Sequence, residues 1–179
     1  MKPVWINALL FQLAWPACVL GAAAGVVWPG LLVVGLMAWH GVRHPVPGDL
    51  RLVVAAVAVG LVLGWAWPAF GLLEYSSPAP VTGLAPIWIV ALWVALALCL
   101  NHCLAWLVHR PLIWPALFGL VGSPLSYWSA SRFGATTFIA DTFTVLLVLG
   151  VAWAAVMAGL AALAQGMRDS TPGFLGETT

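Results

Sequence analysis

The length of its uncharged stretches constrains this chain more than any other feature. No aspartate, glutamate, lysine or arginine occurs in residues 3–42, 52–73, 75–109, 111–131 or 142–167. A helix needs about 20 apolar residues to cross the hydrocarbon core of a bilayer. Only 6% of the 179 residues are charged, whereas a soluble domain carries about 25% and needs them to cover its surface. The sequence therefore predicts a polytopic membrane protein.

Turn and proline signals divide the chain into a compact all-α bundle of about six transmembrane helices. Proline lacks the backbone donor that a helix interior needs, so it favours helix starts and breaks. The spans are predicted at residues 4–24, 27–43, 51–72, 86–109, 112–131 and 138–165, with the fifth interrupted at Gly122, Ser123 and Pro124. Residues 1–167 are predicted to form one transmembrane domain, and residues 168–179 to form a polar, disordered tail.

The basic residues predict how these spans are oriented. Cytoplasmic loops of membrane proteins carry an excess of lysine and arginine. Both termini and the loops on one side carry five of the basic residues, and Arg132 alone falls on the other side. We therefore expect both termini in the cytoplasm of a bacterial cell, with the protein in the inner membrane. The five residues are Lys2, Arg43, Arg51, Arg110 and Arg168.

Two further patterns bear on partners. Gly21 and Gly25, like Gly60 and Gly64, have the spacing that lets membrane helices approach closely. These faces serve either packing within the chain or a homo- or hetero-oligomer. The net charge of +1 provides no basic field for nucleic acid, so membrane lipids are the expected partners.

The polar residues inside predicted spans are the main chemical information. Polar side chains at membrane depth usually face the bundle interior. Asn7 and Gln12 lie on the first span, and Asn101 and His102 lie on the fourth. The four histidines suggest a metal site, but no HExxH motif or inward carboxylate accompanies them. We therefore predict no metal and no cofactor.

The segment around the fifth span is the most polar part of the predicted membrane region. Ser126 and Tyr127 precede Arg132, and Asp141 follows in the next span. Arg132 and Asp141 form either a structural ion pair, with Asp141 at a helix N-terminus, or a site for an anionic headgroup. The candidate pocket comprises Asn7, Gln12, Asn101, His102, Ser126, Tyr127, Arg132 and Asp141.

Several short motifs resemble one family. They are Phe11-Gln12-xx-Trp15, Pro86-x-Trp88-Ile-xx-Leu92-Trp93, Asn101-His102, Gly122-Ser-Pro-Leu-Ser-Tyr127 and Arg132-x-Gly134-Ala135. In this order they resemble the bacterial membrane family filed as domain of unknown function 2878, over residues 1–165. The resemblance implies a multi-pass inner-membrane protein with no assigned activity. Ser123 departs from the glycine expected before the proline.

The function predicted from the residues is to bind or handle a lipid or another apolar molecule. No nucleophile elbow, P-loop or Rossmann fingerprint occurs, so no catalytic residue is assigned and the enzyme question stays open. One alternative is an integral-membrane enzyme on lipid, with His102 or Asp141 as the acid or base. A structural subunit of a larger membrane complex and a small transporter also remain open.

Overall fold

The structure, a computed structural model, describes residues 3–77 and 84–169. The elements in chain order are α1 (Pro3–Ala23), α2 (Trp28–Arg43), α3 (Asp49–Ala69), β1 (Leu73–Tyr75), α4 (Ile87–Asn101), α5 (Ala105–Val108), α6 (Ile113–Arg132), β2 (Thr136–Phe138) and α7 (Thr142–Asp169). The all-helical prediction is confirmed, apart from two short strands. Of the predicted tail, residues 168–169 continue α7 and residues 170–179 lie outside the described residues, as do Lys2 and residues 78–83 of the predicted loop.

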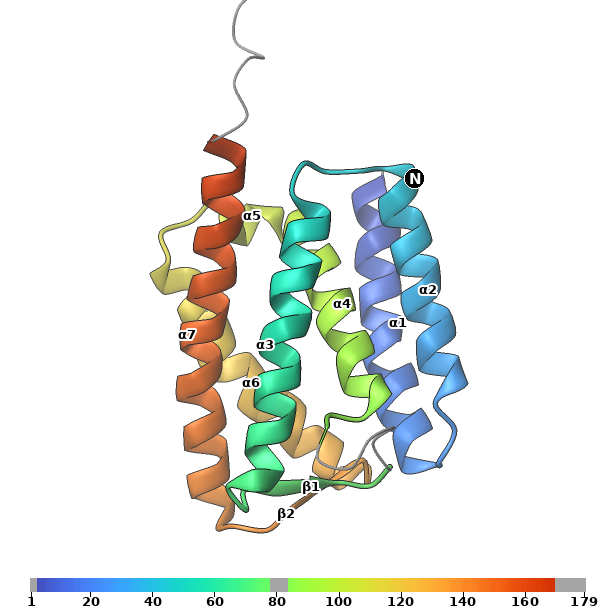
Figure 1. Ribbon diagram of the computed structural model, residues 1–179, viewed down its shortest axis with the longest axis vertical. Helices are drawn as coiled ribbons and strands as arrows, with labels where there is room; N and C mark the ends of the chain where they lie inside the picture. The colour runs from blue at the N-terminus through green and yellow to red at the C-terminus, as the bar shows by residue number, and fades with distance from the viewer. Residues whose placement is uncertain (1–2, 78–83, 170–179) are drawn as a thin grey trace, which may run out of the picture.

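The longer helices run between two ends of the molecule, and α5 lies across one of them (Figure 1). α1 begins and α7 ends at that same end. α4 is the central helix, because it packs against α1, α2 and α3 and is buried on all sides. A helix that is apolar all round is expected in such a position.

Two predicted helix boundaries are wrong. The fourth helix ends at Asn101 rather than continuing to residue 109, and His102 leaves helical geometry with φ −109° and ψ −89°. The fifth is not interrupted, because α6 continues through Pro124. Proline cannot donate to the carbonyl of Leu120, and Gly150 of α7 packs directly against that carbonyl and the proline ring. The absence of a side chain at Gly150 therefore lets α7 cover the irregularity in α6.

The two loops at the other end form an antiparallel sheet that the sequence did not predict. Leu73 pairs with Phe138, and Tyr75 pairs with Thr136. Ser76 extends the pairing by donating its backbone N–H to the carbonyl of Ala135 at 3.0 Å. The sheet therefore ties the segment after α3 to the segment before α7 (Figure 1).

The small-residue face of α3 is used for packing within the chain. A Cβ atom at Gly60 would lie 2.3 Å from the Trp93 ring, and one at Gly64 would lie 2.4 Å from the Cβ of Ala85. Both distances are too short for a side chain, so these glycines let α3 approach α4 closely. The two residues are buried, which leaves this face covered by α4.

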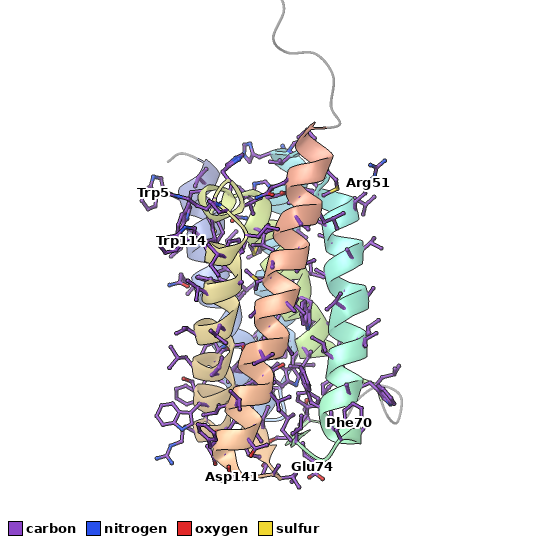
Figure 2. The ribbon with its side chains drawn as sticks, turned by 90° about the vertical axis from the view of Figure 1, so that its left-hand side faces the viewer. Trp5, Arg51, Phe70, Glu74, Trp114 and Asp141 are labelled. Carbon is purple, nitrogen blue, oxygen red and sulfur yellow. The ribbon has the colours of Figure 1, made fainter. Side chains whose placement is uncertain are left out.

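Among the residues that the structure describes, three helices are long and apolar enough to cross a membrane, at Val4–Ala23, Asp49–Ala69 and Thr142–Met167. Many large apolar side chains are exposed on the outside of the bundle, including Leu9, Val54 and Val151. Figure 2 shows Trp5, Trp114 and Arg51 near one end, and Phe70, Glu74 and Asp141 near the other. An apolar girdle between two polar ends indicates a membrane protein.

Candidate functional site

A cavity of about 420 Å³ lies between two parts of the bundle. α6 and α7 pack closely on each other, whereas α1 to α4 form the other part. Side chains of α1 and α4 line one wall, and side chains of α6 and α7 line the other. The volume lies within the range of about 300–1,000 Å³ found for small-molecule sites.

The chemistry of the lining is apolar and uncharged. None of the residues described around the cavity is aspartate, glutamate, lysine, arginine or histidine. Gln12, Phe118 and Leu125 line the cavity and are also exposed on the surface of the molecule. The cavity therefore opens sideways between α1 and α6. Its aromatic and aliphatic residues include Phe11, Trp15, Trp88, Leu92, Trp93, Leu96, Trp153 and Met157.

One hydrogen bond joins the two walls. The indole N–H of Trp15 donates to the hydroxyl oxygen of Ser126 at 2.7 Å. The Trp15 ring also meets Phe133 edge-on, with 6.3 Å between ring centroids. Both contacts lie toward the sheet end of α6, so they fix the spacing of α1 and α6 there.

Four polar aromatic side chains from four elements meet beside the cavity. The hydroxyl of Tyr127, on α6, lies next to the polar atoms of Trp67, Tyr75 and Trp153. None of those three atoms makes a hydrogen bond of ordinary geometry, although all are buried. We call Trp67, Tyr75, Tyr127 and Trp153 the donor cluster. Burial raises the pKa of the Tyr75 phenol, which lies in β1, well above its usual range.

Other aromatic contacts position the donor cluster. Trp153 stacks on Trp93 with 4.6 Å between ring centroids and 15° between planes. Trp88 meets Tyr75 edge-on at 5.9 Å. Trp88 also lines the cavity, and its buried indole N–H has no partner in the structure. Two rigid rings of α4 therefore hold the cluster from one wall of the cavity.

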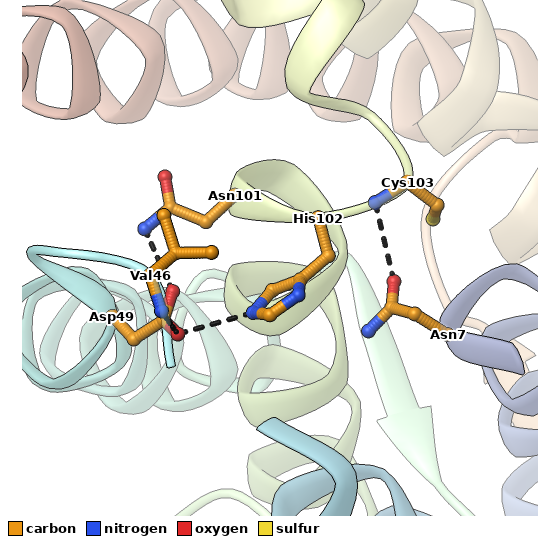
Figure 3. A network of polar contacts seen from close by, with 6 residues as sticks. All are labelled: Asn7, Val46, Asp49, Asn101, His102 and Cys103. Carbon is orange, nitrogen blue, oxygen red and sulfur yellow. Dashed lines mark hydrogen bonds and ion pairs between the residues drawn. The ribbon is translucent and has the colours of Figure 1, made fainter. Parts of the chain in front are cut away.

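A second polar site lies at the opposite end of the bundle, around Asp49 at the start of α3 (Figure 3). One carboxylate oxygen of Asp49 accepts a hydrogen bond from the side-chain amide of Asn101 at 2.8 Å. The other oxygen lies 3.0 Å from Nε2 of His102 and accepts the backbone N–H of Val46 at 3.0 Å. Because α4 stops at Asn101, these contacts hold its irregular end against the start of α3.

Asn7 and two further histidines surround this network. The side-chain oxygen of Asn7 accepts the backbone N–H of Cys103 at 3.3 Å, which ties α1 to the same end of α4 (Figure 3). His40 lies between His44 and His102, with ring centroids 4.8 and 6.4 Å away. Within the described ranges, no three histidine, cysteine, aspartate or glutamate side chains are arranged to hold a metal ion.

Arg132 and Asp141 lie near the sheet end, where both are exposed. Among the described residues the two form no ion pair. Asp141 instead caps α7, because its carboxylate accepts the backbone N–H of Thr144 at 3.1 Å. That contact agrees with the helix N-terminal interpretation of Asp141.

The eight residues of the predicted pocket thus fall into three places. Gln12, Ser126 and Tyr127 line the cavity. Arg132 and Asp141 lie on the surface near the sheet. The remaining three, Asn7, Asn101 and His102, belong to the network at the other end.

Sequence reasoning missed Asp49 and, apart from Tyr127, the members of the donor cluster. Asp49 follows Pro47 and Gly48, so the local sequence indicates no more than a turn there. The predicted topology places that turn on the same side as His102, which is a signal that could have paired them. Trp67 and Trp153 carry no such signal, because tryptophan is frequent throughout the chain.

The comparisons with known proteins give one family. The family model described as protein of unknown function (DUF2878) matches residues 4–159. The chain belongs to this family. No curated protein and no solved structure matches it. The matched region contains all of the cavity lining and the Asp49 network, so both sites lie within the family region.

Proposed function

We propose that this protein is a six-span inner-membrane protein that takes an apolar molecule, such as a lipid, from the bilayer into the cavity between α1 and α6. The cavity carries the proposal. It opens sideways at Gln12, Phe118 and Leu125, and its surroundings on the outside of the bundle are apolar. A molecule dissolved in the hydrocarbon could therefore reach it without crossing water.

The six-span topology rests on how the helices and charges are arranged. α2 and α4 are shorter than α1, α3 and α7, but they run beside them between the same two ends (Figure 1). Arg43 ends α2, Arg51 lies in the first turn of α3 and Arg110 follows α5, all at the end where α1 begins (Figure 1). Arg132 ends α6 at the opposite end. By the positive-inside rule, this arrangement supports an orientation with the Asp49 network on the cytoplasmic side and the sheet on the outer side.

Gln12 supports access from the lipid. It lies near the middle of α1, and its side chain is exposed. An amide at that depth costs free energy when it faces only hydrocarbon. A bound molecule with a polar atom at the mouth of the cavity would offset that penalty.

The experiment fills the cavity without disturbing the fold. Gly122 lines the cavity, and a Cβ atom there would meet nothing within 4 Å. Gly122→Leu is therefore expected to fold and to lower labelling of the purified protein by a photoreactive alkane several-fold. Gly159→Leu is the matched control, because Gly159 is exposed on α7 and equally free of neighbours. Equal labelling of both variants and the wild type would contradict the proposal.

Acid–base chemistry on a lipid is a second candidate function, supported by the contact between His102 and Asp49 at 3.0 Å. A carboxylate that holds one ring nitrogen can orient histidine as a general base. If this candidate is right, lipid extracted from membranes with active protein contains a product that is missing with a folded His102→Ala variant. Identical lipid profiles would exclude it.

A further inference from the structure

We infer that the cavity selects an uncharged lipid with a carbonyl oxygen, and that Tyr127 donates a hydrogen bond to this oxygen. The inference rests on the proposed function, because it names the chemical class of the molecule bound. The first observation is the absence of charged side chains from the described cavity lining. An ionic headgroup inside would lose its hydration and find no counter-charge.

The second observation is the excess of donors around Tyr127. An indole N–H can only donate a hydrogen bond. Trp67 and Trp153 both lie beside the Tyr127 hydroxyl, so its oxygen is the acceptor that they face. The Tyr127 proton can then go to the neighbouring Tyr75 oxygen or to a ligand oxygen, and a ligand oxygen leaves Tyr75 available as a further donor. Neighbouring donors also polarise that hydroxyl, which strengthens the bond it can give.

Buried polar atoms without partners point to a missing acceptor in the same region. The indole N–H of Trp88 and the hydroxyl of Thr136 have no partner, and both side chains are 2% exposed and line the cavity. Buried polar groups in proteins are nearly always hydrogen-bonded. A ligand oxygen near Tyr127, with small side-chain rotations at Thr136, would reduce this deficit.

The third observation is the way polarity changes along the cavity. Ser126, Tyr127 and Ser129 lie in the last turns of α6, and Thr136 lies in the sheet beyond them. Toward the middle of the bundle the lining is mainly apolar and includes Leu96, Phe118 and Met157. Gln12 at the mouth and Ser123 on α6 are the polar residues there. The ligand therefore binds with its carbonyl toward the sheet and its hydrocarbon chain toward the middle of the bilayer.

The test compares probes that share one alkyl chain and one diazirine but differ in their end group. The probes are an alkane, a methyl ester, a carboxylate and a trimethylammonium, added to the full-length protein in phosphatidylcholine nanodiscs. One net hydrogen bond corresponds to about fivefold in binding, so we expect the ester to label the cavity about fivefold more than the alkane. Carboxylate and trimethylammonium probes should label less than the ester.

Variants then assign this preference to Tyr127. Tyr127→Phe keeps the ring and removes the donor, so ester labelling should fall to the alkane level while alkane labelling stays unchanged. Thr136→Val should also weaken the preference for the ester over the alkane. It provides the test of the donors if Tyr127→Phe does not fold. Thr137→Val is the matched control, because Thr137 is exposed in the same strand and does not line the cavity.

The outcomes separate this inference from the proposed function. Equal labelling by ester and alkane in the wild type, or stronger labelling by a charged probe, overturns the choice of an uncharged carbonyl lipid. Retention of the ester preference in both Tyr127→Phe and Thr136→Val overturns the role of the donors. If no probe labels the cavity, or if Gly122→Leu does not change the labelling, the proposed function itself is contradicted.

Discussion

Replacing Asp49 by alanine should destabilise the bundle more than any other single carboxylate removal among the described residues. The change removes the acceptor of three contacts, to Val46, Asn101 and His102. A net hydrogen bond contributes about 1 kcal/mol, and one to a charged group about 2 kcal/mol. All three contacts are to the charged carboxylate, so the sum is about 6 kcal/mol. Because the Asp49 side chain is 16% exposed, water compensates in part, and we expect a loss of about 2–4 kcal/mol.

The measurement is reversible unfolding in mixed micelles, with dodecyl sulfate titrated into a mild detergent and tryptophan fluorescence as the signal. Asp141→Ala is the control, because Asp141 is exposed and makes only local contacts at the start of α7. Loss of such a cap costs about 1 kcal/mol. The difference between the two variants therefore reports the interhelical part of the Asp49 contacts.

A double-mutant cycle adds a sharper criterion. Asp49 and His102 are in direct contact, so Asp49→Ala and His102→Ala should be non-additive by about 1–2 kcal/mol. The reasoning is refuted if Asp49→Ala destabilises no more than Asp141→Ala. It is refuted equally if the effects of the two network substitutions simply add.

Two further predictions concern packing and ionisation. Gly60→Leu should prevent α3 from packing on α4, because a Cβ atom at Gly60 would lie 2.3 Å from Trp93. The free energy of unfolding should fall by about 3 kcal/mol or more in the unfolding assay described above. Gly159→Leu is the control and should be nearly neutral in the same assay. Tyr75 should resist ionisation, because burial raises its pKa well above the ordinary tyrosine value of about 10. The Tyr127→Phe variant isolates this group, because Tyr75 is then the remaining tyrosine. In that variant the ultraviolet signal of phenolate should be absent at about pH 11. The neutral phenol favours the folded state, so stability should fall as the pH rises above about 10. Ionisation of Tyr75 near pH 10 in the folded protein would contradict this.

Most of the long helices were predictable because each follows from a local property, whereas the short helix α5 was not predicted. Uncharged stretches indicate where the helices lie, and prolines such as Pro29 and Pro111 set several of their limits. The sheet was not predictable, because each strand has three residues and depends on a partner far away in the chain. Periodicity cannot be recognised in so short a segment.

The candidate site was predictable only in part, for a similar reason. Polar residues inside a span, such as Gln12 and Tyr127, stand out in an apolar background. Which of them share a cavity depends on how α6 and α7 lie against α4, and no local pattern encodes that. Pro124 shows what a local pattern cannot predict. In the sequence it indicates a helix break, but in the structure Gly150 on the neighbouring helix accommodates it.

The order of synthesis has a consequence for the cavity. At one end the sheet, which needs β2, ties the two halves of the bundle together. At the other end Gln165 of α7 donates to the carbonyl of Val108 at 2.6 Å, which ties α7 to α5, the short helix between the halves. Both ties join residues more than fifty positions apart, and both need the last part of the chain. While the ribosome is still making α7, the cavity has only one complete wall. A chain that stalls there exposes the uncovered side of α4 to lipid, which distinguishes an unfinished chain from a finished one.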